Sequence, residues 1–214
     1  MRMTKFTHAC VRLDDAGRSL VIDPGAFSEC DEALDGASAV LITHEHFDHL
    51  NADAVLSAAR ANPDLRVWAP PSVVQQLTEL GPRATPTAPG ESFDADGFSV
   101  RAFGGQHAVI HPAVGTPCAN LGYLVDDTVY HPGDSFFVPP VAVPTLLVPL
   151  HAPWSKLAEV IDFVIAVRAP QAFPIHDAML SDSGAQNSVG HVGRFAETYG
   201  TAITYLAATD AVEV

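Results

Sequence analysis

The stretch that decides the fold is Thr43-His44-Glu45-His46-Phe47-Asp48-His49-Leu50, which directly follows the apolar run Ala39-Val40-Leu41-Ile42. Its spacing is HxHxDH, with three histidines and one aspartate within six residues. A β-strand followed by a tight loop can aim alternate side chains at one point. Imidazole nitrogens and carboxylate oxygens are ligands that Zn²⁺, Mn²⁺ and Fe²⁺ accept. The spacing therefore predicts a metal site rather than a surface loop that is histidine-rich by chance.

Short apolar and β-branched runs bounded by Gly, Pro and Asp predict strands around this motif. The predicted strands are Lys5–Leu13, Ser19–Asp23, Ala39–Thr43, Arg66–Ala69, Phe98–Phe103, Leu121–Val125, Thr128–His131, Thr145–Val148, Gln171–Ile175 and Ala202–Leu206. The predicted helices are Ala52–Ala61, Ser72–Leu80, Ser155–Val167 and Gln186–Tyr199. We expect one α/β domain over residues 1–214, made of two βα halves that join near 81–97 and pack sheet to sheet.

Composition and charge exclude several classes of function. The chain has 214 residues with 11 basic and 25 acidic side chains, a net charge of −14, and no run of Lys or Arg stands out. Nucleic acids and anionic membranes both require clustered cations, so neither is expected as a partner. Three cysteines without a CxxC pair indicate free thiols in a reducing compartment. With no signal peptide and no long apolar stretch, we expect a cytoplasmic protein that acts on a small molecule.

The HxHxDH stretch resembles the signature of the metallo-β-lactamase-fold superfamily, and the resemblance covers essentially the whole chain. It implies an αββα sandwich of two packed mixed sheets with outer helices. It also implies three later ligands at strand ends, which match His107, Asp134 in His-Pro-Gly-Asp-Ser and His176 in Pro-Ile-His-Asp. His111 competes with His107, which lies nearer its strand end. Asp177 competes with His176, but the family pattern favours the histidine, so we expect Asp177 to be a loop charge or a cap.

The resemblance divides these residues between two divalent ions, zinc being expected and manganese or iron being alternatives. One ion would be held by His44, His46 and His107, the other by Asp48, His49 and His176, and Asp134 would bridge the two. Asp23, in Ile22-Asp23-Pro24-Gly25, matches a family position that supports the ligand loop.

Four other histidines need an interpretation. His8 lies in Thr7-His8-Ala9-Cys10, which partly matches a Gly-His-Ala element of a branch that includes ascorbate 6-phosphate lactonase and short metal-dependent hydrolases. It predicts either a residue that contacts a ligand or the substrate, or a core histidine. His151 follows a strand end and is expected to line the pocket or support a ligand. His131 is expected to pack within a strand, and His191 to lie on the surface of the last helix.

The function implied is a metal-dependent hydrolase of a small-molecule ester, lactone or related bond. Two adjacent divalent ions would lower the pKa of a shared water, and the resulting hydroxide would attack a carbonyl or phosphorus. Asp48 and Asp134 would orient this hydroxide as well as bind metal. Phosphodiesterase activity is one alternative. A mononuclear-iron oxidoreductase similar to persulfide dioxygenases is another, although the full second ligand set counts against it. Whether the chain forms a homo-oligomer is left open.

Overall fold

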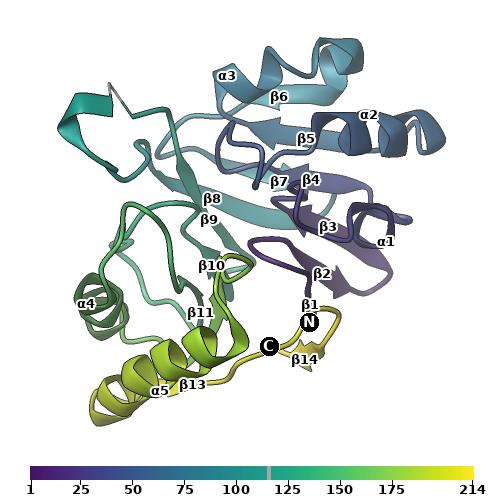
Figure 1. Cartoon of the computed structure of the whole chain (residues 1–214). Helices are drawn as coiled ribbons and strands as arrows, with labels where there is room; N and C mark the ends of the chain where they lie inside the picture. The colour runs from purple at the N-terminus through teal and green to yellow at the C-terminus, as the bar shows by residue number, and fades with distance from the viewer. Residues whose placement is uncertain (115–116) are drawn as a thin grey trace.

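The structure, a computed structural model that describes residues 1–114 and 117–214, has four layers (Figure 1). Two seven-stranded sheets pack face to face in the middle, and helices cover the outer face of each. Each sheet is antiparallel on one side and parallel on the other. The predicted αββα sandwich of two mixed sheets is therefore confirmed.

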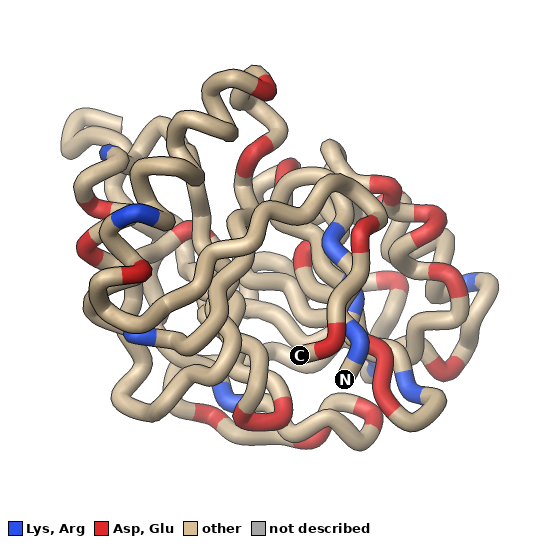
Figure 2. The backbone as a smooth tube through the Cα atoms, turned by 90° about the horizontal axis from the view of Figure 1, so that it is seen from below, with Lys and Arg blue, Asp and Glu red and all other residues tan. Residues whose placement is uncertain are grey.

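The first sheet is built from both ends of the chain. Its strands are β1 (Arg2–Lys5), β2 (Val11–Asp15), β3 (Arg18–Ile22), β4 (Ala39–Leu41), β5 (Arg66–Ala69), β6 (Ala84–Pro86) and β14 (Ala211–Glu213), in the order β14-β1-β2-β3-β4-β5-β6. Met3 pairs with Val212, so the two termini lie side by side, as Figure 2 shows from below. The helices α1 (Cys30–Leu34), α2 (Ala52–Ala61) and α3 (Pro71–Val74) accompany this sheet.

The second sheet follows the first along the chain. Its strands are β7 (Ser92–Ala95), β8 (Phe98–Gly104), β9 (Leu121–Val125), β10 (Val129–His131), β11 (Thr145–Pro149), β12 (Gln171–Ile175) and β13 (Ala202–Ile203), in the order β13-β12-β11-β10-β9-β8-β7. The helices α4 (Leu157–Val167) and α5 (Asp182–Thr198) pack on its outer face. Two 3₁₀ turns, η1 (Thr78–Arg83) and η2 (Pro112–Val114), complete the described elements.

Alternation along the strands produces three apolar layers. In β3, Leu20 and Ile22 belong to the core between the sheets, whereas Val21 belongs to the core under α1 and α2. On β4, Leu41 faces the other sheet and Val40 faces the helices in the same way. Successive side chains of a strand point to opposite faces, so a strand that is apolar throughout can contact both a sheet and a helix layer.

The predicted strand Lys5–Leu13 is wrong as one element. The chain reverses between β1 and β2, and the amide of Phe6 donates to the carbonyl of Cys10 at 2.8 Å. His8 lies in this turn with a φ of 70°, a left-handed conformation that residues other than glycine rarely adopt. An apolar pattern does not reveal a reversal made by a histidine at positive φ, so the turn was invisible in the sequence.

Several short elements also differ from the prediction. The segment 81–97 is not only a connection, because it contains β6 of the first sheet and β7 of the second. The predicted helix Ser72–Leu80 splits into α3 and η1, while α1 and β14 were not predicted. Elements of three to five residues carry too little periodicity to be recognised alone. No helix of the described residues is long and apolar enough to cross a membrane.

Candidate metal centre

The loop Thr43–Leu50 connects β4 to α2 and is held by Asp23, the residue directly after β3. The buried carboxylate of Asp23 accepts hydrogen bonds from the amide and hydroxyl of Thr43, at 2.7 and 2.6 Å, and contacts Nδ1 of His49 at 2.7 Å. Gly25 lets the loop approach closely, because a Cβ there would lie 1.9 Å from the carbonyl oxygen of Asp48. The interaction with Asp23 orients His49 so that Nε2 points away from it.

His44, His46 and His107 form the first ligand group. Each offers a nitrogen, and the three nitrogens lie within 4.8 Å of one another. The ring of His107 is fixed by a 2.6 Å contact between Nδ1 and the carbonyl of Ala108, and its amide donates to the carbonyl of Cys118 at 3.0 Å. Because Nδ1 of His107 donates its proton to a carbonyl, Nε2 carries no proton and can offer its lone pair to a metal ion.

His8, Asp48, His49 and His176 form the second group, with one atom of each again within 4.8 Å of the others. Nδ1 of His176 lies 2.6 Å from the carbonyl of His151, which directs its Nε2 into the group. His8 differs, because its Nδ1 accepts from the amide of Ala178 at 3.3 Å and its Nε2 lies 3.2 Å from Asp48. Both nitrogens of His8 are used, so it supports Asp48 rather than offering a lone pair.

Asp134 lies between the two groups. Its Oδ1 is 3.0 Å from Nε2 of His49 and 3.1 Å from Nε2 of His176, while its Oδ2 is 3.2 Å from Nε2 of His107. The indole of Trp154 donates to Oδ2 at 2.8 Å. One carboxylate thus faces both groups.

The donor atoms of the cluster fit a cation. Although Asp134 lies 3.0–3.2 Å from three of the histidines, several buried atoms make no hydrogen bond of acceptable geometry to any described residue: Nε2 of His44, His49, His107 and His176, and Oδ1 of Asp134. Leaving a buried polar atom unpaired costs about 1–3 kcal/mol. Nitrogen and oxygen atoms that converge without partners, each held by a hydrogen bond on its other side, are typical of a site for zinc or a similar transition metal.

Protonation states agree with this interpretation. Burial lowers the pKa of His44 and of His46, which keeps both imidazoles neutral as metal binding requires. Burial of Asp48 opposes ionisation, but the hydrogen bond from His8 and the charge of His49 outweigh it and hold its pKa at about 2. Asp134 also ionises more readily than usual: burial opposes this, but the surrounding histidines lower its pKa well below its normal range.

His49 differs from the other histidines of the cluster. Burial alone would lower the pKa of His49, but Asp134 and Asp23, on opposite sides of the ring, raise it well above its usual value. Two buried carboxylates on either side of an imidazole favour its positively charged form.

The structure brings together the seven sequence-predicted ligands and separates their competitors from them. The seven are His44, His46, Asp48, His49, His107, Asp134 and His176. His111 is exposed and lies in neither group of the cluster. Asp177 lies in the loop after β12, as expected of a loop charge, and its carboxylate is buried in an ion pair with Lys5 at 3.1 Å.

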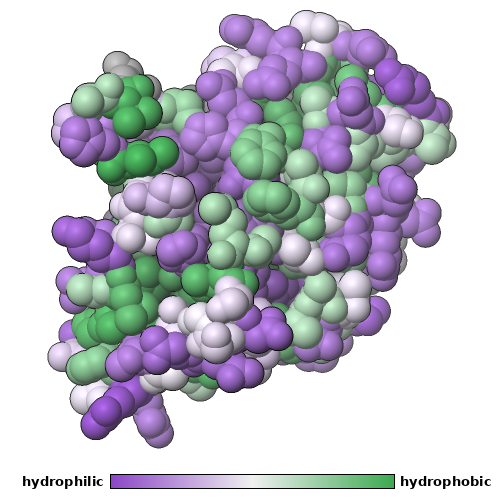
Figure 3. All heavy atoms as spheres, viewed as in Figure 1, coloured by the Kyte–Doolittle hydropathy of each residue, from purple (hydrophilic) through white to green (hydrophobic). Residues whose placement is uncertain are grey.

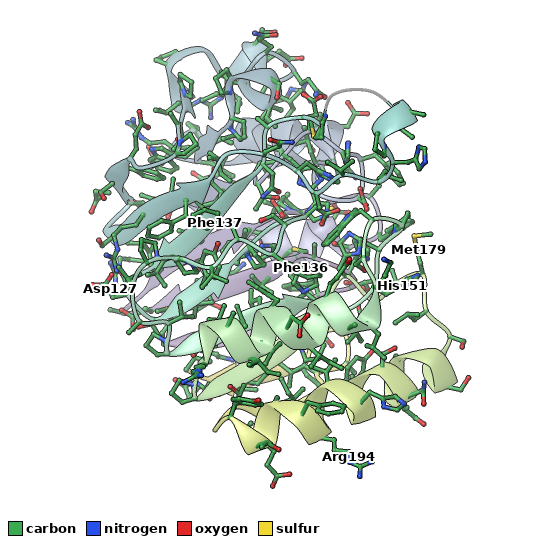
Figure 4. The ribbon with its side chains drawn as sticks, turned by 90° about the vertical axis from the view of Figure 1, so that its left-hand side faces the viewer. Asp127, Phe136, Phe137, His151, Met179 and Arg194 are labelled. Carbon is green, nitrogen blue, oxygen red and sulfur yellow. The ribbon has the colours of Figure 1, made fainter. Side chains whose placement is uncertain are left out.

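The remaining predicted residues have distinct environments. The side chain of His151 is exposed and lies near Met179 at the surface (Figure 4), so this residue supports the site through its backbone and does not line the pocket with its ring. His131 is fully buried in β10, and its Nε2 lies 2.8 Å from the carbonyl of Ala9. His191 is exposed on α5, as expected.

Two residues at the site were missed. Trp154, which contacts Asp134, follows the end of β11, and this strand-end position was the available signal. Asn120 precedes β9, and its Oδ1 accepts from the amide of Asp134 at 2.9 Å while its Nδ2 donates to the carbonyl of Pro132 at 2.9 Å. Gly133 permits this packing, because a Cβ there would lie 2.3 Å from Asn120. Nothing in the local sequence of Asn120 indicates this role.

A cleft of about 620 Å³ opens above the cluster. Its floor includes His46, Asp48, His107, Asp134 and His176. In Figure 3, hydrophobic atoms lie on the projecting loop that carries η2, at the upper left, and on the body of the molecule opposite. This volume lies within the range of about 300–1,000 Å³ that is typical of small-molecule sites.

The two packed sheets and the histidine cluster at their edge define a protein of the metallo-β-lactamase fold. The chain belongs to the family described as the beta-lactamase superfamily domain, whose model matches residues 2–176. Protein Rv0786c of Mycobacterium tuberculosis is 38% identical over 186 residues, which are 85% of this chain and 86% of that protein.

The chain is also similar to a second curated protein and to a solved structure. The UPF0173 metal-dependent hydrolase of Xanthobacter autotrophicus is 32% identical over 153 residues, 63% of this chain and 62% of that protein. Among solved structures, Igni18, a metallo hydrolase from Ignicoccus hospitalis, has a TM-score of 0.75 at 18% identity and covers 99% of this chain and 97% of its own. The family match and the relative named a metal-dependent hydrolase confirm the predicted metal-dependent hydrolase, and Igni18 shows the same fold.

Proposed function

We propose that the chain is a hydrolase with two divalent cations, and that it cleaves an ester, a lactone or a related bond of a small molecule. The observation that carries this proposal is the position of Asp134, whose carboxylate faces both ligand groups at 3.0–3.2 Å. A centre for a single ion would need only one of these groups. The presence of both therefore favours two ions over the mononuclear-iron alternative.

Each cation would be held by a different set of residues. His44, His46 and His107 would hold one cation, and Asp48, His49 and His176 the other. Two adjacent divalent cations, when bound, lower the pKa of a shared water and polarise the oxygen of the bond to be cleaved. A nitrogen-rich set with two carboxylates suits zinc, with manganese or iron as alternatives.

The two carboxylates would also orient the reacting water. Both Asp48 and Asp134 are ionised at neutral pH, because their pKa values are lowered. An ionised carboxylate only accepts hydrogen bonds, so each can orient a water toward the substrate. The hydrogen bond of 3.2 Å between His8 and Asp48, and that of 2.8 Å between Trp154 and Asp134, fix the direction of these lone pairs.

The proposal is tested by metal analysis of protein purified without added metal or chelator. We expect close to two equivalents of zinc or manganese per chain, together with hydrolysis of model esters or lactones that a chelator abolishes. His44→Ala and Asp134→Ala should each lose hydrolysis and bind less metal, because a missing ligand leaves an under-coordinated ion. One iron per chain with oxygen uptake on thiol substrates would overturn the proposal, as would full activity in either variant.

A further inference from the structure

The cleft above the cluster has an apolar wall, of which only the indole of Trp154 also contacts a ligand residue. The apolar wall consists of Phe47, Ile110, Pro153, Trp154 and Met179. These residues come from four separate loops: the motif loop and the segments that follow β8, β11 and β12. These four loops place apolar side chains around one opening, where the side chains are not part of the hydrophobic core.

Three members of the wall are unusually exposed for their type. Phe47 is 63% exposed, Met179 is 59% exposed and Ile110 is 48% exposed. Phe47 is held against Phe27, with ring centroids 5.5 Å apart in an edge-to-face arrangement. Large apolar side chains gathered around a concave site, rather than scattered singly, mark a binding surface.

The charges of the described residues around the cleft do not favour an anionic group that lies away from the ligand cluster. Neither Lys nor Arg is among the described residues that line it, and Glu45 adds an acid to the rim. Lys5 is buried in its ion pair with Asp177, and the whole chain carries a net charge of −14. A phosphate or carboxylate lying along the wall would lose its hydration without gaining a charged partner, which is unfavourable.

We propose that the substrate carries an uncharged apolar substituent of several carbon atoms, which packs against the apolar wall beside the bond that is cleaved. This inference rests on the proposed function, because the reacting bond must lie at the cluster on the floor of the cleft. It selects esters, thioesters, lactones and amides with apolar acyl groups, and it disfavours substrates whose substituent along the apolar wall is charged. The cleft of about 620 Å³ accommodates such a group.

The first test is binding to the zinc-loaded protein by calorimetry, with straight-chain hydroxamates from two to eight carbons. The hydroxamate head binds the metal equally in every member, so the series isolates the tail. Each methylene that the wall buries should tighten binding about fourfold, from about 0.8 kcal/mol per methylene.

A second ligand tests charge at constant length. The eight-carbon hydroxamate is compared with one whose tail ends in a carboxylate. We expect the carboxylate to bind at least about tenfold more weakly, because its charge would be desolvated beside Glu45 without a partner. p-Nitrophenyl octanoate should likewise be hydrolysed more efficiently than p-nitrophenyl acetate, because only its acyl chain reaches the apolar wall.

Variants of the apolar wall test whether its residues bind the tail of the hydroxamate. Phe47→Ala and Met179→Ala should each weaken binding of the eight-carbon hydroxamate about tenfold and leave the two-carbon ligand unchanged. Phe195→Ala is the matched control, since Phe195 is 47% exposed on α5 and does not line the cleft. Figure 4 shows this part of α5, near the labelled Arg194, well separated from Met179.

The outcomes distinguish the two proposals. Tail-dependent binding that the wall variants remove supports the inference. Binding and metal-dependent hydrolysis that ignore tail length, or that favour the carboxylate, overturn the inference and leave the hydrolase intact. If no hydroxamate binds and no ester is cleaved by the metal-loaded protein, the proposed function fails, and the inference fails with it.

Discussion

The two halves of the molecule supply ligands in different ways. The first half places four of them in one short loop, the motif Thr43–Leu50. The second half places His107, Asp134 and His176 after three different strands, 27 and 42 residues apart in the sequence. The first arrangement depends on local geometry, whereas the second depends on the register of a whole sheet.

The supporting contacts differ in the same way. In the first half, one buried carboxylate, Asp23, contacts both Thr43 and His49. In the second half, His107 and His176 each contact a backbone carbonyl, and the Asp134 loop rests on Asn120. The first half therefore concentrates its support in one side chain, while the second distributes it over the backbone. Substitutions should expose this difference.

The largest effect should follow removal of a second-half ligand. His107→Ala should reduce activity by more than about 100-fold, beyond the usual effect of residues that only orient ligands, and should lower the metal content. His111→Ala is the matched control, because His111 is exposed outside the cluster and should behave as the unmodified chain. Metal analysis and kinetics decide the assignment; loss of metal in His111→Ala alone would reverse it.

Removal of the first-half support should come next. Asp23→Ala would leave Thr43 and His49 without their buried partner, and we expect it to lower the free energy of unfolding by about 3 kcal/mol. Metal affinity should fall about 10- to 100-fold. Asp14→Ala, which removes a partly exposed ion pair with Arg12, should cost less than about 1 kcal/mol. Denaturant unfolding of the metal-free protein measures the stability of both variants. Equal losses of unfolding free energy in Asp23→Ala and Asp14→Ala would mean that Asp23 supports the loop no more than a surface ion pair does.

A smaller effect is expected at Trp154. Trp154→Phe keeps most of the packing but removes the 2.8 Å hydrogen bond to Asp134. We expect metal affinity to fall about tenfold with little change in unfolding free energy of the metal-free chain. Trp68→Phe is the control, because Trp68 packs between the sheets and should lower stability without changing metal affinity. Competition with a metal-binding dye separates the two variants.

The smallest effect is expected at Cys118, although its Sγ lies 3.7 Å from Nε2 of His46. Burial and the charge of Glu45 raise the pKa of this thiol to about 11, so it is protonated at neutral pH. Cys118 belongs to neither ligand group of the described residues, so Cys118→Ser should keep activity within about twofold. Alkylation by iodoacetamide at pH 7 should be slow. Loss of metal from Cys118→Ser would instead make the thiol a ligand.

The sequence was sufficient for the coarse fold and for the candidate ligands. Apolar runs bounded by Gly, Pro and Asp predicted most strands, and apolar residues at helical spacing predicted most of the longer helices. The HxHxDH spacing led to the superfamily, which in turn indicated His107, Asp134 and His176. Short elements such as α1 and β14 could not be predicted, because three to five residues carry no clear hydrophobic periodicity. The turn at His8 was lost because its positive φ is imposed by the packing around it.

The sequence by itself determined the chemistry of the site, since residue types and spacing restrict which ligands a metal can find. Only the tertiary structure decided how that chemistry is held and what it faces. Trp154, Asn120 and the carbonyl of His151 become partners of the ligands solely because strands distant in sequence end at the same edge. The apolar wall arises in the same way, as side chains from four loops converge on one opening. Convergence of this kind depends on packing over the whole chain, and no local pattern encodes it.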